Sequence, residues 1–392
     1  MTASAGQQPK RGRLPYLDGL RAMAALWVLA SHSFDMLGLN AASSVPGLLQ
    51  GIVQATSYAR IAVAAFIVIS GFSLMLPLAV QPPGLTWRTF LPFSRRFYAR
   101  RASRILPPYY AALALSVALG IALRLESAHA LVADGLSHVL LLHDISYAFY
   151  HWNQYAAFNP PLWSIAVEWH IYALFPLLVM FWQRYGILRT AGMAILASWI
   201  VVEVVALRAT RSLDFPFYVG GMTFPYYGFF AAGVMAAVTA FGPSAEAVRL
   251  RRLPWGGMAA GCFLMSLTAL VLLPKYLYTQ NSEVFAIPFA LGVASLLIFL
   301  ASCRDSVAER ILSARPLATL GGFSYSLYLI HYPLCLLLGR LLGHLHLLGT
   351  NLGFWVVLLG FCPVTILVAY AFSRGFERRW SLPAPLRSRT SP

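Results

Sequence analysis

Long apolar runs dominate the chain and alternate with short segments that carry most of its charge. The runs are about 18 to 22 residues long, which is the length that an α-helix needs to cross a bilayer. The pattern therefore predicts an all-α fold, a polytopic transmembrane helical bundle of about ten spans. The predicted spans are 17–39, 60–79, 105–124, 161–182, 188–207, 222–240, 256–273, 284–301, 317–340 and 352–373.

The basic residues between these runs predict how the bundle is oriented. An even number of spans places both termini on one side. If that side is the cytoplasm, 22 of the 29 Lys and Arg residues fall in cytoplasmic segments and six on the other side. Short cytoplasmic loops are enriched in Lys and Arg, so both termini are expected to be cytoplasmic. We divide the chain into a basic N-terminal tail (1–16), a transmembrane domain (17–373) and a basic C-terminal tail (374–392).

Composition agrees with a membrane protein and narrows its partners. The chain is 59% hydrophobic and 11% charged, whereas soluble domains carry about 25% charged residues. The basic residues behind the net charge of +16 lie in the short loops between the predicted spans, as in membrane proteins. We therefore expect the lipid bilayer as a partner and no nucleic acid. The four cysteines and the histidines of the long external loop show no metal-ligand spacing. We therefore expect no metal site and a solvated loop over 125–160, which holds His129, His138, His143 and His151.

The first span carries ionisable residues along one face. Arg21 and His32 are eleven residues apart, which is about three helical turns or roughly 16 Å. Asp18 and Asp35 extend this stripe by one turn at each end. Charged groups inside a membrane are costly and usually functional, so the stripe is expected to face the bundle interior. His32 is either a general base, oriented by a carboxylate such as Asp35, or an interior histidine bonded to a neighbouring helix.

The fourth span carries a second polar stripe. Ser164, Glu168 and Tyr172 recur every four residues and so share one helix face. Glu168 and His32 are expected at similar depths, where they could share one cavity. Glu168 then competes with Asp35 for the role of orienting His32, and the alternative is a structural hydrogen bond between helices.

The ninth span adds a third stripe. Ser324, Tyr328 and His331 lie on one face near the middle of the predicted span. They are either pocket residues or hydrogen-bonding contacts between helices.

An arginine cluster precedes the third span. Residues 95–104 contain five arginines, including Arg101 and Arg104. Arg suits the bidentate binding of phosphate, and contact with lipid headgroups is the alternative.

These motifs together resemble the acyltransferase-3 family of bacterial membrane O-acyltransferases, from Leu17 to about Ser373. Small departures are Ile67, Ile171 and His170, at positions where the family more often has Phe, an aromatic residue and Gln. The chain is expected to be the single-domain form. The motifs are Leu17-Asp18-Gly19-Leu20-Arg21 followed by His32, then Phe66-Ile67-Val68-Ile69-Ser70-Gly71-Phe72, Arg101-x-x-Arg104-Ile105-x-Pro107, Trp163-Ser164 with Glu168 and Tyr172, and Ser324-Tyr325-Ser326-Leu327-Tyr328-Leu329-Ile330-His331-x-Pro333.

The resemblance implies an acyl-CoA-dependent O-acyltransferase in the bacterial cytoplasmic (inner) membrane. It implies transfer of an acyl group, commonly acetyl from acetyl-CoA, to a hydroxyl of a glycan, a lipid-linked sugar or a natural product. Acyl-CoA is a donor substrate here, and no bound cofactor is expected. The resemblance also implies that His32 is catalytic and that Arg101 and Arg104 help to bind the donor.

We accordingly predict a site with three groups of residues. A small-molecule or ion-coupled transporter remains the rival interpretation, because charged stripes within spans suit it equally. A non-catalytic partner in glycan export is a third. The predicted residues are His32, Glu168 and Asp35 for catalysis, Arg21, Arg101 and Arg104 for donor binding, and Ser70, Trp163, Ser164, Tyr172, Ser324, Tyr328 and His331 for the pocket.

Overall fold

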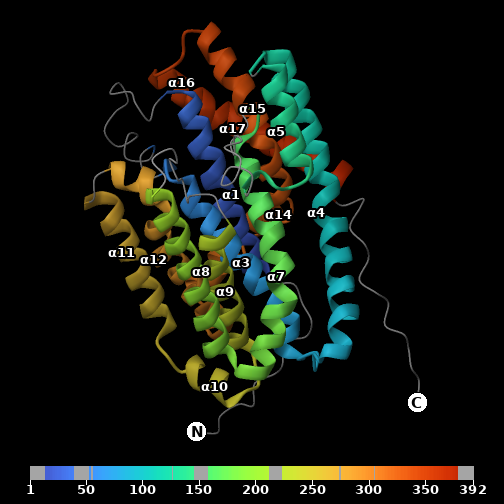
Figure 1. Ribbon diagram of the computed structural model, residues 1–392. Coiled ribbons are helices and arrows are strands. Elements are labelled where there is room, and N and C mark those ends of the chain that lie inside the picture. Colours follow the sequence, from blue (N-terminus) through green and yellow to red (C-terminus); the bar gives the residue numbers. More distant parts are fainter. Residues whose placement is uncertain are drawn as a thin grey trace.

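The computed structural model describes residues 14–38, 53, 56–125, 127–144, 158–211, 223–272, 275–303 and 305–377. These residues form a bundle of helices, and no β-strand occurs among them (Figure 1). In chain order the helices are α1 (Pro15–Met36), α3 (Ala59–Val80), α4 (Trp87–Leu123), α5 (Ala128–Val139), the turn η1 (Pro160–Leu162), α7 (Trp163–Tyr185), α8 (Ile187–Arg211), α9 (Thr223–Phe241), α10 (Ala245–Arg251), α11 (Trp255–Leu272), α12 (Lys275–Ser302), α13 (Val307–Leu312), α14 (Arg315–Gly321), α15 (Ser324–His344), α16 (Asn351–Trp355), the π-helical turns η2 (Val356–Phe361), α17 (Cys362–Phe372) and the π-helical turns η3 (Ser373–Glu377).

The ten predicted spans fall mostly on helical residues, but the span 317–340 joins two helices, α14 and α15, and the span 352–373 covers the consecutive segments from α16 to η3. Within the described residues, five helical segments are long and apolar enough to cross a membrane: α3, α4, η1 with α7, α15, and the rod from α16 to η3. A sixth is reached if α9 and α10, which meet at a 95° bend, count as one broken span. The chain is thus an all-helical membrane protein. The count of ten spans and the cytoplasmic side of the termini stay predictions, and residues 1–13 and 378–392 of the predicted tails lie outside the described residues.

Helix α4 is longer than predicted. The sequence predicts a loop over 80–104 before a span at 105–124, but the helix begins at Trp87 and runs unbroken for 37 residues. Thr86 caps it, because its side chain accepts from the backbone N–H of Thr89 in a capping box. At 1.5 Å per residue the helix is about 55 Å long, against about 30 Å of hydrocarbon in a bilayer. Part of α4 therefore extends beyond the membrane, along one edge of the bundle (Figure 1).

Helices α3 and α9 cross in close contact at the centre of the bundle. A Cβ atom at Gly71 would overlap the carbonyl oxygen of Phe230, and one at Gly233 would overlap that of Val68. Glycines at such crossings let two backbones approach within a membrane, where the hydrophobic effect gives helices little reason to associate. The crossing fixes the height of α3, which carries Ser70 into the site described below.

Helix α1 is held at its start by two further glycine contacts. A Cβ at Gly19 would meet the carbonyl oxygen of Leu312 in α13, and one at Gly321 in α14 would meet that of Asp18. These contacts leave no room for adjustment at the first turn of α1. The ionisable stripe of α1 is thereby placed against α3, α14 and α15.

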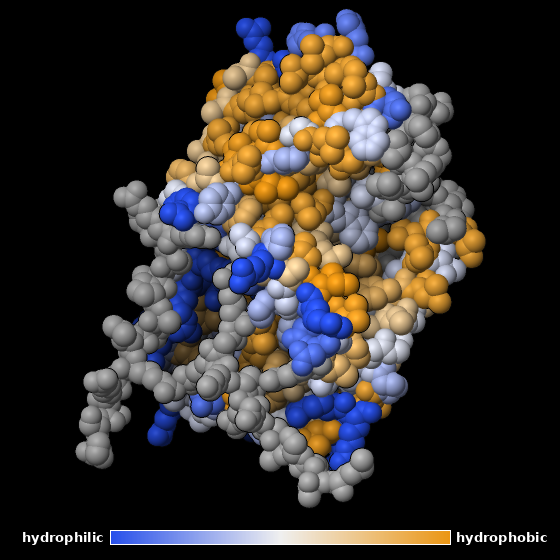
Figure 2. Space-filling model, turned by 180° about the vertical axis from the view of Figure 1, so that it is seen from behind, coloured by the Kyte–Doolittle hydropathy of each residue, from blue (hydrophilic) through white to orange (hydrophobic). Residues whose placement is uncertain are grey.

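The outer surface is rich in exposed apolar side chains. Figure 2 shows hydrophobic side chains covering much of the upper part of one face, with hydrophilic ones gathered lower. Leu264 of α11 and Leu367 of α17 are examples of large apolar side chains that are mostly exposed. A surface of this kind suits contact with lipid, because soluble monomers rarely expose apolar patches of such extent.

Candidate functional site

A cavity of about 430 Å³ lies between α1, α3, α4, α7 and the turn that joins α14 to α15. Three arginines line it, Arg21 from α1 and Arg101 and Arg104 from α4. We call it the arginine cavity. Its other polar residues are Asp18, Ser70, Ser73, Ser164, Glu168, Tyr172, Ser324, Tyr325, Tyr328 and Glu377.

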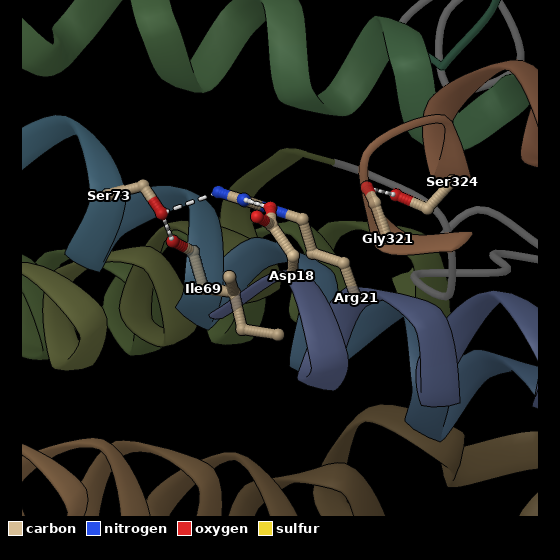
Figure 3. Close-up of polar contacts among 6 residues, drawn as sticks. All are labelled: Asp18, Arg21, Ile69, Ser73, Gly321 and Ser324. Atoms are coloured by element: carbon tan, nitrogen blue, oxygen red, sulfur yellow. Dashed lines mark hydrogen bonds and ion pairs between the residues drawn. The ribbon is translucent and has the colours of Figure 1, made fainter. Parts of the chain in front are cut away.

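Arg21 is fixed in this cavity by two side chains (Figure 3). Its Nη1 donates to Asp18 Oδ1 at 3.1 Å, and its Nη2 donates to Ser73 Oγ at 2.6 Å. Ser73 in turn donates to the carbonyl oxygen of Ile69 at 2.6 Å, which sets its lone pairs toward the arginine. A guanidinium has five N–H donors, so these two bonds leave three for a ligand.

Arg101 and Arg104 reach the cavity from one face of α4, at a spacing of three residues. The helix is attached to α7 at this level, because Tyr98 donates to the carbonyl oxygen of Ala173 at 2.8 Å and Phe97 packs on Phe175. Neither arginine has an ion pair or hydrogen bond with any residue in the described part of the chain. Arg101 and Arg104 thus line the cavity beside Arg21 with no directly bonded carboxylate in the described part of the chain, and guanidinium groups in this state suit the binding of an anion.

Glu168 also lines the cavity and is held there by hydroxyl groups. Ser70 donates to Glu168 Oε1 at 3.0 Å, and the Tyr172 hydroxyl donates to the same oxygen. Ser70 and Tyr172 are also bonded to each other at 2.6 Å. These bonds hold the Glu168 side chain in place, so the arginine cavity contains an anchored carboxyl group as well as cations.

A second cavity of about 260 Å³ adjoins the first and contains His32. We call it the histidine cavity. Arg60 of α3 and Trp163 of α7 also line it, and the Arg60 guanidinium lies 5.7 Å from the centre of the Trp163 ring. The aromatic ring, the cation and the imidazole surround one space near the start of α7.

Two side chains line both cavities. Val63 of α3 and Tyr328 of α15 belong to the wall of each. The Tyr328 hydroxyl donates to the carbonyl oxygen of Pro161 at 2.8 Å and is bonded to Ser164 Oγ at 2.7 Å. The phenol is therefore fixed across the boundary, and we call Val63 and Tyr328 the shared wall.

His32 is bonded to a second histidine. Its Nδ1 lies 2.9 Å from Nε2 of His331, and the two rings are stacked with their centres 5.1 Å apart. Nδ1 of His331 lies 2.7 Å from the carbonyl oxygen of Tyr328. His331 is 1% exposed and lines neither cavity, so it lies behind His32.

These contacts correct two expectations about His32. Neither Asp35 nor Glu168 is the partner of its ring nitrogen: Asp35 is exposed near the end of α1, and Glu168 is bonded to hydroxyl groups. His32 and Glu168 also do not share one cavity, because the shared wall stands between them. The prediction compared only the depths of His32 and Glu168 along their own helices. It could not show that Tyr328, from a third helix, lies between the two side chains.

The other predicted residues divide between the cavities. Arg21, Arg101 and Arg104, with Ser70, Ser164, Glu168, Tyr172, Ser324 and Tyr328, line the arginine cavity, and His32, Trp163 and again Tyr328 line the histidine cavity.

Among the residues of the arginine cavity that the predicted site omitted are three polar ones, Ser73, Tyr325 and Glu377. Ser73 lies three residues after Ser70, so helical spacing could have placed it on the same face. Tyr325 is adjacent to the predicted stripe of α15. Glu377 falls in the predicted C-terminal tail, where nothing in the sequence indicates that its carboxylate accepts from Ser326 at 2.6 Å.

The external loop is also less solvated than predicted. His138 and His143 are buried and stacked, with ring centres 3.9 Å apart. Each bonds a backbone carbonyl, of Asp134 at 2.7 Å and of Leu162 at 3.1 Å. Burial lowers the pKa of His138 to about 4 and that of His143 to about 3, because desolvation disfavours the charged ring. His129 has no described side chain, His151 lies outside the described residues, and no group of three or more metal-ligating side chains occurs in the described part of the chain.

The chain is similar to known acyltransferases along most of its length. A family model described as an acyltransferase domain matches residues 14–374. A putative peptidoglycan O-acetyltransferase of Bacillus subtilis is 26% identical over 341 residues, which cover 83% of this chain and 49% of that protein. An O-acetyltransferase of Staphylococcus aureus is 26% identical over 336 residues, covering 82% of this chain and 50% of that protein.

A peptidoglycan O-acetyltransferase of Listeria monocytogenes is 24% identical over 341 residues, which cover 83% of this chain and 50% of that protein. The chain thus spans about half the length of the curated relatives it matches. No solved structure gives a significant match.

Proposed function

The chain belongs to the acyltransferase-3 family, and from that premise we propose that it moves an acyl group from acyl-CoA to a hydroxyl group. Acetyl is the favoured group, because the relatives are named O-acetyltransferases. The acceptor is a glycan, a lipid-linked sugar or a hydroxylated natural product. Two relatives are named for peptidoglycan, which favours a glycan of the cell envelope.

The donor occupies the arginine cavity. The observation that carries this proposal is that Arg101 and Arg104 line the cavity without ionic partners in the described part of the chain. Charged side chains inside a membrane protein are expensive and usually functional, and these two arginines have no directly bonded carboxylate. Phosphate groups take charge-assisted bonds from arginine, so the CoA phosphates lie at Arg101 and Arg104. The pantetheine arm passes Arg21 and brings the thioester to the shared wall.

The acceptor occupies the histidine cavity. Trp163 offers an aromatic surface, and His32 offers a base, at the same space. An acceptor hydroxyl in this space meets the shared wall from the opposite side to the thioester. The two substrates then come together at Val63 and Tyr328, which separate them until both are bound.

The transfer needs a base, an electrophile and a donor for the oxyanion. His32 accepts the proton of the acceptor hydroxyl, and the oxygen attacks the thioester carbonyl carbon. The intermediate collapses as the C–S bond breaks, and the CoA thiolate takes the proton from His32. We assign the Ser164 hydroxyl, at the shared wall, to stabilise the oxyanion by turning its single O–H from the Tyr328 oxygen to the substrate. Transfer through an acyl-His32 intermediate is the alternative order of events, and it would leave labelled acyl groups on the protein.

The donor side is the cytoplasm in this proposal. The support is the distribution of charge, since 22 of 29 basic residues fall on one side of the predicted topology and that side includes the arginine cluster of α4. CoA is a cytoplasmic anion, so donor and cluster lie on the same side of a bacterial cytoplasmic membrane.

The test is transfer by the purified chain in detergent, with acetyl-CoA labelled in its acetyl group and with glycan, lipid-linked and small-molecule acceptors. Thiol release and label transfer are both measured. His32→Ala is expected to lower transfer at least about 100-fold, the contribution of a general base, while acetyl-CoA still binds. Wild-type turnover in this variant would refute the role of His32. Failure of every acyl-CoA to bind or react would refute the enzyme and favour a transporter.

A second pair of variants tests the donor site. The double variant Arg101→Ala and Arg104→Ala is expected to raise the KM for acetyl-CoA by about 10- to 100-fold, since a hydrogen bond to a charged group is worth about 1.5–3 kcal/mol. Arg95→Ala with Arg96→Ala is the matched control, because both residues lie on α4, are exposed and do not line the cavity. Equal effects from the two pairs would contradict the assignment.

A further inference from the structure

His331 is fixed more firmly than a histidine that only fills space between helices. Pro333 lacks an N–H, so the carbonyl oxygen of Leu329 loses its usual donor within α15. Asn159 replaces that donor, with Nδ2 at 3.1 Å. The helix is thus anchored to the segment before α7 at the level of His331, whose two ring nitrogens are both engaged.

The partners of His331 determine where its proton lies. A carbonyl oxygen has no hydrogen to give, so the 2.7 Å contact with Tyr328 requires a proton on Nδ1 of His331. In the neutral ring, Nε2 is then an acceptor only. Its partner at 2.9 Å, Nδ1 of His32, must therefore be the donor. The proton of neutral His32 is on Nδ1, which leaves the lone pair on Nε2.

That lone pair is available to a ligand. Nε2 of His32 has no hydrogen-bond partner in the described part of the chain, and it is not among the atoms sealed from solvent. His32 lines the histidine cavity whereas His331 does not. The nitrogen on the far edge of the His32 ring from His331 is thus the one that can meet a hydroxyl in the cavity.

We propose that His331 is a positioning residue, which holds the ring proton of His32 on Nδ1 so that Nε2 is the base. A carboxylate does this for histidines in many enzymes, whereas here a neutral imidazole does it, itself held by the carbonyl oxygen of Tyr328. The role of Nε2 as a catalytic base rests on the proposed function. The position of the proton on Nδ1 of His32 follows from the hydrogen bonds alone. Tyr328 thus has two roles: its side chain forms part of the shared wall, and its carbonyl oxygen holds His331. One turn of α15 therefore positions both the wall and the base.

The protonation state can be measured without turnover. Protein labelled with ¹⁵N-histidine is compared with His32→Asn and His331→Leu variants, and the resonances lost on replacing His32 identify its two nitrogens. We expect a protonated Nδ1 and a bare Nε2 for His32 in the wild type, and loss of that preference in His331→Leu. A proton on Nε2 in the wild type would overturn the proposal, even if no acceptor has been found and the proposed function has failed.

Kinetics test the functional consequence. His331→Leu is expected to lower kcat about 100-fold, as when a general base is lost, with the KM for acetyl-CoA unchanged within about twofold. His331→Gln keeps an acceptor oxygen for His32 and is expected to retain activity within about tenfold of the wild type. His344→Leu, an exposed histidine of the same helix, is the control. Equal losses in the Leu and Gln variants, with matching losses of thermal stability, would mean that His331 serves packing alone.

Discussion

The crossing of α3 and α9 offers a sharp test of how the site is held. At Gly71 an added Cβ would overlap the backbone carbonyl of Phe230, which cannot rotate away as a flexible side chain could. Gly71→Ala therefore forces the two helices apart. Overpacking of this kind costs about 1–3 kcal/mol. Since 1 kcal/mol shifts the melting temperature of a domain of 150–250 residues by about 2–4 °C, we expect a fall of about 2–12 °C.

A second glycine provides the matched control. Gly257 lies in α11, and a Cβ there would meet nothing within 4 Å. Gly257→Ala gains helix propensity of up to about 1 kcal/mol, so its melting temperature should equal or exceed that of the wild type. Both variants can be followed in detergent as the folded monomer that remains after heating, measured by size-exclusion chromatography.

The crossing also positions a residue of the arginine cavity. Ser70, next to Gly71, donates to Glu168 from α3, so displacement of α3 should also lower acyl transfer at temperatures where the variant is still folded. Melting of Gly71→Ala at or above the wild-type temperature would refute the reasoning, because it would mean that the two backbones do not meet.

Three other perturbations have definite expected outcomes. Ser73→Ala removes the hydroxyl that accepts from Arg21 Nη2 at 2.6 Å. We expect the KM for acetyl-CoA to rise about tenfold with little change in kcat, since a hydrogen bond to a charged group is worth about 1.5–3 kcal/mol. An unchanged KM would mean that Arg21 does not bind the donor. Tyr328→Phe removes the hydroxyl that bonds Pro161 and Ser164, and we expect faster acetyl-CoA hydrolysis relative to transfer, read as thiol release without acceptor. Burial lowers the pKa of His138 to about 4 and that of His143 to about 3, compared with about 6.5 for a histidine in an open loop. Below pH 6.5 the unfolded state therefore binds more protons than the folded state, and the stability of the fold decreases as the pH falls. Lowering the pH from 7.5 to 5.5 should therefore reduce the stability of the folded segment that contains them by about 1.4 kcal/mol per histidine. Hydrogen exchange of amides 137–144, corrected for intrinsic rates, would detect this loss. Equal protection of these amides at both pH values would contradict the burial of the two rings.

The helices could be predicted from sequence because their signals are local. Apolar runs and charged gaps placed α3 and α7 within a few residues of their observed positions, whereas the predicted span 317–340 merged α14 with most of α15. The start of α4 could not be predicted in this way, because its first turns are rich in arginine and resemble a loop in hydropathy. Hydropathy measures preference for lipid, whereas the capping box at Thr86 decides where the helix begins.

The site could be predicted as a set of residues but not as an arrangement. Spacing along one helix identified the stripes that contain Arg21, Glu168 and Tyr328. Which stripe faces which neighbour depends on the rotation and height of each helix, and glycine contacts between helices set both. The pairing of His32 with His331 joins residues 299 positions apart, so no pattern within either helix contains it. The same holds for Glu377, whose placement depends on how the last helix returns to the bundle.

The shared wall has an electrical consequence. Protein and lipid insulate one side of a membrane from the other, and the potential difference falls mainly where water is excluded. In the proposed function the arginine cavity opens to the cytoplasm and the histidine cavity to the opposite side, so with water in both the insulating layer is reduced to about the thickness of the side chains of Val63 and Tyr328. A full potential of 100 mV across so short a path is worth about 2.3 kcal/mol for each charge that crosses it. A neutral acyl group would then cross the shared wall without electrical work, whereas a proton or a thiolate would have to do work against the potential or gain energy from it.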